Sequence, residues 1–174
     1  PSPQYIGAKG GNLSSFLKKQ HRIPRTGRAD TRQVMNYPHW KTTPTSEADW
    51  FEALTALARY LRSPDGCPWD RKQTSKNFAD YLREEAEELD EAFEEGDNEH
   101  IEEEWGDAFF CMLATIAAAE EEGRCNLRHA LQRIHEKMIR RHGHIFGEHT
   151  AETPEDAVKV WNRIKAAERD SVSE

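Results

Sequence analysis

The chain has 174 residues, of which 32% are charged and 36% are hydrophobic, and its formal net charge is −8. No run approaches the ~18 consecutive apolar residues that a membrane span needs, and the N-terminus has no apolar signal-peptide region, so we expect no membrane partner. Three cysteines, an odd number without C-x-x-C spacing, predict reduced thiols and a cytoplasmic location and argue against a zinc site.

The N-terminal segment has the opposite charge to the rest of the chain. Residues 1–46 hold eight basic side chains and one acidic, about +7, which leaves about −15 for the remainder. Their composition predicts a flexible basic extension over 1–45, followed by a folded domain over 46–170. Two further roles stay open for this extension: binding nucleic acid, or folding over the acidic body.

From residue 46 the pattern is almost wholly helical. Ser46 and Asp49 have the spacing of a capping box, so a first helix is expected to begin there and to end at the turn residues 64–66. Further start and stop signals predict a second helix from Thr74 or Ser75 to Gly96, a third from Asp97 or Asn98 to Gly123, a fourth from Asn126 to about Gly143, and a fifth opened by Thr153 and Pro154.

Apolar residues recur at helical spacing along these segments. Those expected to face the core are Phe78, Leu82, Leu89 and Phe93 on the second helix, and Leu127, Leu131, Ile134 and Met138 on the fourth. No strand pattern of comparable length occurs. The sequence therefore predicts an all-α bundle of about five helices, and its short connections favour antiparallel neighbours.

Two pairs of carboxylates are the main candidate functional residues of this chain. Glu85 with Glu88, and Glu104 with Asp107, have i,i+3 spacing, so each pair shares one helix face. The turn at Gly96 is expected to bring the two helices together, with both pairs facing one cavity. Ionised carboxylates in an apolar stripe are costly unless they are compensated, and oxygen ligands favour Mg²⁺ or Mn²⁺. The pattern E-E-x-x-E … E-x-x-D thus predicts a divalent-metal site that can clamp a polyphosphate.

Two other interpretations of the acidic residues compete with this one. Acids on helices most often form solvated faces, and we expect this of Glu87, Asp90, Glu91, Glu94, Glu95, Glu102 and Glu103. A ferritin-like di-iron bundle needs Glu-x-x-His on two helices. The nearest pattern here is Asp97-x-x-His100 at the turn, so the di-iron interpretation is disfavoured.

Four more segments accompany the acids in chain order. They are Gly66-Cys67-Pro68-Trp69-Asp70 with Gln73-Thr74, the turn E-E-E-G-R at 120–124, the stretch E-K-M-I-R-R-H-G-H-I-F-G at 136–147, and Trp161-x-x-x-Lys165. With these segments, residues 47–169 resemble the MazG nucleoside triphosphate pyrophosphohydrolases. The chain departs from the family pattern at Cys125, where phenylalanine is usual, and at Gly143, where proline is usual.

The resemblance implies a Mg²⁺-dependent hydrolase, with Mn²⁺ as a substitute, that converts a nucleoside triphosphate into the monophosphate and pyrophosphate in nucleotide-pool housekeeping. It places Glu85, Glu88, Glu104 and Asp107 at the positions of the metal ligands. Glu84 belongs to the same catalytic motif, and it is expected either to orient water or to face solvent.

Basic residues of the last two helices suit the phosphates of such a substrate. Lys137, Arg141 and His144 have i, i+4, i+7 spacing, which gives a positive stripe. By resemblance, the substrate-binding residues are Trp69, Lys137, Arg140, Arg141, Trp161 and Lys165. Two alternatives remain: the cations pair with surface acids, and the tryptophans are packing residues.

Other functions remain open from the sequence. One is an all-α pyrophosphatase of narrow specificity for dUTP, dCTP, a guanine nucleotide or phosphoribosyl-ATP. Another is a nucleic-acid-binding module that acts through the basic arm, whose affinity would fall steeply with salt. A homodimer or higher assembly is also expected, because Phe109, Phe110, Met112 and Leu113 expose more apolar surface than one neighbouring layer needs. The alternative is that the fifth helix covers this surface.

Overall fold

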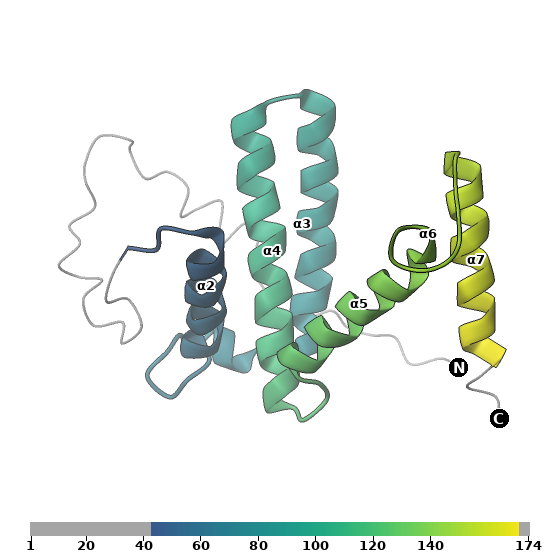
Figure 1. The fold of residues 1–174 in the computed structure, drawn as a ribbon. Coiled ribbons are helices and arrows are strands. Elements are labelled where there is room, and N and C mark those ends of the chain that lie inside the picture. The colour runs from purple at the N-terminus through teal and green to yellow at the C-terminus, as the bar shows by residue number, and fades with distance from the viewer. Residues whose placement is uncertain (1–42, 171–174) are drawn as a thin grey trace, which may run out of the picture. The chain divides into compact units, whose positions relative to one another are not determined.

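The computed structural model describes residues 43–170, so the predicted extension over 1–45 lies almost wholly outside the described residues. Within the described range the chain forms six α-helices, one 3₁₀ turn and no strand (Figure 1). They are α2 (Glu47–Leu61), η2 (Asp70–Lys72), α3 (Ser75–Glu95), α4 (Asn98–Glu121), α5 (Leu127–Arg141), α6 (Gly143–Phe146) and α7 (Pro154–Asp170). This confirms the predicted all-α class. None of the described helices combines the length and apolar character of a bilayer span.

The chain divides into two compact units. The first ends at Arg124 and contains α2, α3 and α4, and the second begins at Cys125 and contains α5, α6 and α7.

Local capping signals set the helix ends as predicted. Ser46 and Asp49 form a capping box at the start of α2, and Thr74 forms a second box with Asn77 at the start of α3. Gly96 ends α3 in the left-handed region, at φ 73°, where a side chain would add strain. The side chain of Asp97 then accepts a hydrogen bond from the backbone N–H of Glu99 and opens α4.

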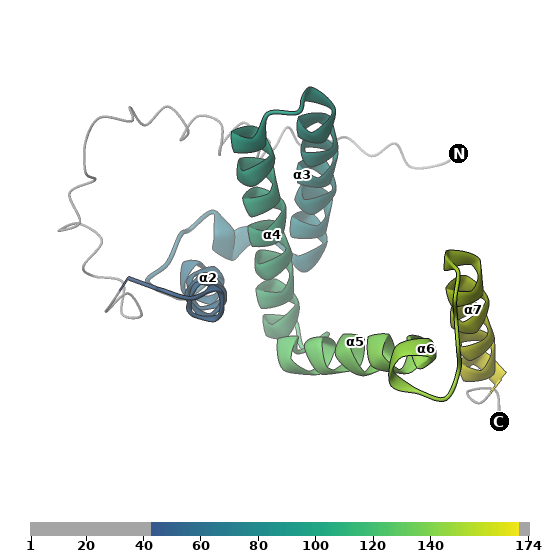
Figure 2. The same cartoon turned by 45° about the horizontal axis from the view of Figure 1, so that its top comes forward.

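The two acidic helices α3 and α4 form an antiparallel hairpin that lies side by side in both views (Figures 1 and 2). Their contact surface follows a seven-residue repeat, the spacing that keeps one helix face against its neighbour. The repeat places Phe78, Glu85 and Ala92 in the interior from α3, and Glu104, Cys111 and Ala118 from α4. Glu85 and Glu104 therefore occupy core positions of the hairpin.

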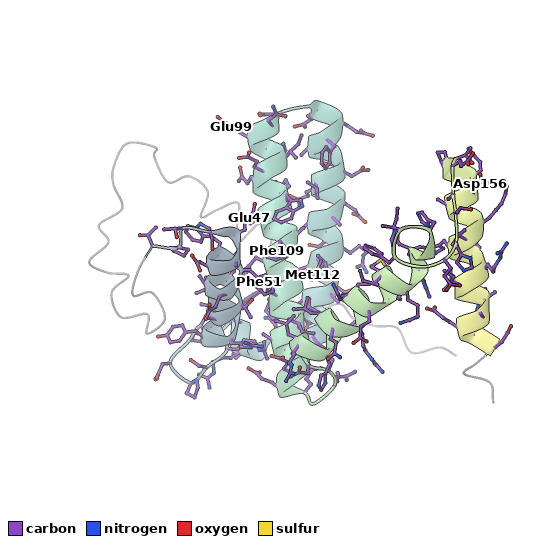
Figure 3. The ribbon with its side chains drawn as sticks, viewed as in Figure 1. Glu47, Phe51, Glu99, Phe109, Met112 and Asp156 are labelled. Carbon is purple, nitrogen blue, oxygen red and sulfur yellow. The ribbon has the colours of Figure 1, made fainter. Side chains whose placement is uncertain are left out.

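A small apolar core lies between α2 and α4. It is built from Ala58, Leu113 and Ala117, and Phe51 and Phe109 pack against it. Figure 3 shows these two phenylalanines between the two helices. The alanines of this core are small, and the aromatic rings of Phe51 and Phe109 fill the space beside them.

Several apolar side chains that were predicted to face the core are exposed in the structure. On α3, Phe93 is 59% exposed and its neighbour Ala92 is fully buried. On α5, Leu131 and Ile134 are 45% and 43% exposed, contrary to the expectation that they face a core. Adjacent helical residues point about 100° apart, so a one-residue error in phase moves a side chain from the interior to the surface.

The connection from α2 to α3 is held by a buried arginine. Arg62 donates through Nη1 to the backbone carbonyls of Asp70 and Gln73, at 2.6 and 3.0 Å, and through Nη2 to Glu121 Oε2 at 2.7 Å. In the same connection a Cβ on Gly66 would lie 2.2 Å from the carbonyl oxygen of Tyr60, so only glycine fits there. The Gly66–Asp70 motif is thus part of the framework beneath the acidic hairpin.

Candidate metal centre and phosphate-binding residues

Three carboxylates converge inside the α3–α4 hairpin. One oxygen from each of Glu85, Glu88 and Glu104 lies within 4.8 Å of the others. Glu85 is 1% exposed and Glu104 is 4% exposed, while Glu88 is half-buried. The seven-residue repeat explains the convergence, because it points Glu85 and Glu104 at one another from facing helices. By contrast, the seven acids predicted to be solvated are all exposed.

The donor set suits a hard divalent cation. All three groups offer carboxylate oxygens, the ligands preferred by Mg²⁺ and Mn²⁺. Among the described residues, the buried Oε2 atom of Glu104 has no hydrogen-bond partner, and neither has the buried Oε2 of Glu84. A buried carboxylate oxygen without a partner is costly, and a bound cation would remove that cost. The three clustered carboxylates therefore fit the predicted metal.

Asp107 and Glu84 lie beside this cluster but outside the group within 4.8 Å. Both are half-buried, and together with Glu85 they act electrostatically on the thiol of Cys111. Burial, followed by the negative charges of Glu85, Asp107 and Glu84, raises the pKa of Cys111 to about 12. The carboxylates of α3 and α4 thus share one buried environment. The partnerless buried oxygen of Glu84 disfavours the alternative that this side chain faces solvent.

Cys111 and Cys125 are expected to react with a thiol reagent at different rates. Cys111 is fully buried and Cys125 is exposed, so a thiol reagent at pH 8 should label Cys125 promptly and leave Cys111 unmodified until the protein unfolds. Because the folded-state pKa of Cys111 is raised from 9.0 to about 12, its contribution to stability is complete below pH 9 and is lost as the pH rises towards 12. Pulse labelling followed by peptide mass mapping measures the reactivity. Equal labelling rates for Cys111 and Cys125 would contradict this placement.

His100 is a site residue that the sequence analysis missed. Its Nε2 lies 3.1 Å from Glu104 Oε1, and its Nδ1 lies 3.0 Å from Glu95 Oε2. The hydrogen bond to Glu95, and then that to Glu104, raises the pKa of His100, against the opposing effect of burial. The i,i+4 spacing of His100 and Glu104 was the available signal, although the sequence pattern suggested His100 only as a metal ligand.

In the second unit, two of the predicted phosphate-binding arginines share one carboxylate. Arg141 donates from Nε and Nη2 to Glu168 Oε2, at 3.0 and 2.8 Å, and Arg140 donates from Nε to Glu168 Oε1 at 2.7 Å. Hydrogen bonds from Arg141 and Arg140 lower the pKa of Glu168. Both arginines therefore pair with a neighbouring acid in this structure, which is the alternative that the sequence left open for the cations.

Trp161 and the predicted lysines differ from the arginines in their contacts. The guanidinium of Arg141 lies 5.3 Å from the ring centre of Trp161, a cation–π arrangement that joins α5 to α7. Within the described range neither Lys137 nor Lys165 makes a hydrogen bond or ion pair, so both ammonium groups remain available to a ligand.

Trp69 belongs to the first unit and packs there against Phe78 and Tyr81, with ring centres 6.2 and 5.8 Å apart. Trp69 is therefore a packing residue in this structure, as one alternative from the sequence had it. A contact between Trp69 and a nucleotide stays a prediction. The acidic cluster and the cationic residues of α5 and α7 belong to different units.

Comparison with known proteins supports the acidic motif and the segments around it. Residues 73–146 match the model of the MazG nucleotide pyrophosphohydrolase domain. A solved structure of a MazG-related protein from Thermotoga maritima aligns with a TM-score of 0.58 and 33% identity, over 66% of this chain and 98% of that one.

Curated relatives match the same part of the chain. The nucleoside triphosphate pyrophosphohydrolase/pyrophosphatase MazG of T. maritima is 40% identical over 119 residues, covering 68% of this chain and 45% of the relative. The nucleoside triphosphate pyrophosphohydrolase of Escherichia coli K12 is 34% identical with the same coverage, and the protein YabN of Bacillus subtilis is 38% identical over 70% of this chain and 25% of its own length. The chain therefore spans between a quarter and a half of these relatives. On its motif, its fold and these similarities, the chain belongs to the MazG nucleotide pyrophosphohydrolase family.

Proposed function

We propose that the chain hydrolyses nucleoside triphosphates to the nucleoside monophosphate and pyrophosphate, with Mg²⁺ as cofactor and Mn²⁺ as a substitute. The observation that carries the proposal is the convergence of Glu85, Glu88 and Glu104 within 4.8 Å, at core positions of the hairpin, in a chain of the MazG family. The names of the T. maritima and E. coli relatives state this activity for those proteins.

The acidic residues are the proposed binding site for the cation. Glu85, Glu88 and Glu104 would hold the cation, and Asp107, predicted as a fourth ligand, would add negative charge close to them. A divalent ion bound there supplies neutralisation of polyphosphate charge and lowers the pKa of a water molecule. A carboxylate of the same cluster would accept the proton of the water molecule that attacks the substrate.

The phosphate-binding role falls to cationic residues of α5 and α7. Lys137 and Lys165 offer ammonium groups without a partner in the described range, and each can meet a phosphate oxygen as a point charge. Arg141 offers a planar fork held over Trp161, although Glu168 occupies it in this structure. These roles apply to the catalytic domain that we propose over 46–170. A cytoplasmic location is proposed from the three free cysteines.

The test is pyrophosphate release from a panel of all common NTPs and dNTPs, with Mg²⁺, with Mn²⁺ and with EDTA. We expect the monophosphate and pyrophosphate in equal amounts, only when a metal is present. Strong preference for one base or sugar would select the narrow-specificity alternative. Release of orthophosphate instead of pyrophosphate, or no cleavage of any nucleotide with either metal, would contradict the proposal.

We further propose that the chain assembles as a homodimer or higher oligomer through the apolar face of α4. Of the residues predicted for this face, Met112 is 53% exposed, whereas Leu113 is buried and Phe109 and Phe110 are half-buried against the core with α2. Trp105, which was not predicted for this face, is 56% exposed, and its ring centre lies 5.2 Å from that of Phe109. Large exposed apolar side chains on one helix commonly mark an interface. Light scattering should give at least twice the chain mass for the wild type, and a smaller mass for Met112→Glu. A wild-type mass of one chain at micromolar concentration would contradict the assembly.

A further inference from the structure

His100 joins the two acidic helices at the end of the hairpin that carries their turn. It lies in the first turn of α4, while Glu95 is the last residue of α3. The two ring nitrogens contact carboxylate oxygens of different helices, Nδ1 with Glu95 at 3.0 Å and Nε2 with Glu104 at 3.1 Å. Two contacts on opposite sides fix both the position and the plane of the imidazole.

The contact with His100 makes the two carboxylate oxygens of Glu104 different from one another. Oε1 is occupied by His100, while the buried Oε2 has no hydrogen-bond partner among the described residues. A carboxylate side chain rotates about its terminal torsion unless one oxygen is held, because the wells of that torsion are broad. A fixed Oε1 therefore leaves Oε2 in a defined position as the oxygen that can coordinate a cation.

We propose that His100 is a positioning residue for the metal centre: it holds Glu104 through Oε1 so that Oε2 is preorganised for the divalent ion. The inference rests on the proposed metal site of Glu85, Glu88 and Glu104. Hydrogen bonds from outside the ligand shell commonly change metal affinity by about 10–100-fold, because they orient the ligands before binding.

Three substitutions at one position separate the hydrogen bond from the bulk of the ring. The amide nitrogen of glutamine takes a place close to that of Nε2, so His100→Gln keeps a donor for Glu104. Asparagine is shorter and places its amide close to Nδ1, so His100→Asn reaches towards Glu95 alone. His100→Leu has a similar volume and no donor. His129→Leu is the matched control, because the His129 side chain is exposed and has no hydrogen bond or ion pair within the described residues.

The experiment is a titration of the metal-free full chain with Mn²⁺ at one pH, in which the free ion is followed by electron paramagnetic resonance without nucleotide. We expect His100→Leu and His100→Asn to weaken Mn²⁺ binding by about 10–100-fold, and His100→Gln and His129→Leu to stay within about threefold of the wild type. In turnover assays, the Mg²⁺ concentration for half-maximal rate should rise for the two defective variants, while kcat at saturating Mg²⁺ stays close to that of the wild type.

Two results would overturn the inference and leave the proposed function standing. One is wild-type Mn²⁺ affinity in His100→Leu, and the other is an equal loss in His100→Gln and His100→Asn, since only the first of these keeps the donor. If the leucine variant does not fold, the glutamine and asparagine pair still decides the question. A wild-type chain that binds no Mn²⁺ would instead overturn the metal centre itself, and the positioning role with it.

Discussion

Replacing Glu104 by glutamine is expected to lower pyrophosphate release by at least about 100-fold, because a direct ligand should matter more than the second-sphere partners that cost about 10–100-fold. Glutamine keeps the shape of Glu104 and can still accept the hydrogen bond from His100, but it loses the negative charge that a divalent ion needs. The rate should be measured with Mg²⁺ under saturating nucleotide, and Mn²⁺ affinity should fall with it.

The same substitution should leave the metal-free protein at least as stable as the wild type. Glu104 is 4% exposed and close to two other carboxylates, so neutralising it removes both repulsion and the cost of a buried charge. Thermal unfolding in EDTA measures this. Glu102→Gln is the control, since Glu102 is an exposed acid on the same helix and should retain full activity. More than a tenth of wild-type activity in Glu104→Gln would show that this carboxylate is not a ligand.

Replacing Arg62 by alanine is expected to reduce the free energy of unfolding by about 1–3 kcal/mol, the cost of leaving a buried polar group without its hydrogen-bond partner. The side chain of Arg62 is 5% exposed, and its loss leaves the carbonyl of Gln73 without this donor, whereas the carbonyl of Asp70 keeps the backbone N–H of Gln73 and the half-exposed Glu121 turns to water. It also removes the guanidinium that lies 5.8 Å from the Phe78 ring centre. Urea denaturation followed by circular dichroism gives the value.

Arg59 provides a matched comparison for Arg62. Both arginines leave α2 and pair with neighbouring acids of α4, but the side chain of Arg59 is 51% exposed in its pair with Glu120. Solvent screens such a pair, so Arg59→Ala should cost less than about 1 kcal/mol. Equal effects of the two substitutions would show that the buried network of Arg62 does not stabilise the α2–α3 connection.

Much of the helical framework could be predicted because its signals are local. Ser46 with Asp49, Gly96, Asp97 and Asn126 act on backbone groups only a few residues away, and the helices begin and end where these residues predicted. The short helix α6 and the turn η2 were not predicted, because neither is long enough to show a helical period.

The acidic cluster was predictable for a related reason. The i,i+3 spacing puts Glu85 and Glu88 on one face of a helix, and the Gly96 turn folds that helix back on the next. The convergence of Glu85, Glu88 and Glu104 follows from these two local facts together with the hairpin. The seven-residue repeat, however, is visible only once alanine and cysteine are recognised as the interior residues beside the two glutamates.

The sequence alone thus determined the helical class, the helix ends and the acidic motif, since each depends on backbone geometry or spacing within one helix. Only the tertiary structure decided that Ala92 rather than Phe93 is interior, that His100 contacts Glu104, that Arg62 is buried, and that Glu168 is shared by Arg140 and Arg141. Each of these depends on which neighbour a side chain meets. That choice is made by packing between elements, and a change of one position in helical phase is enough to alter it.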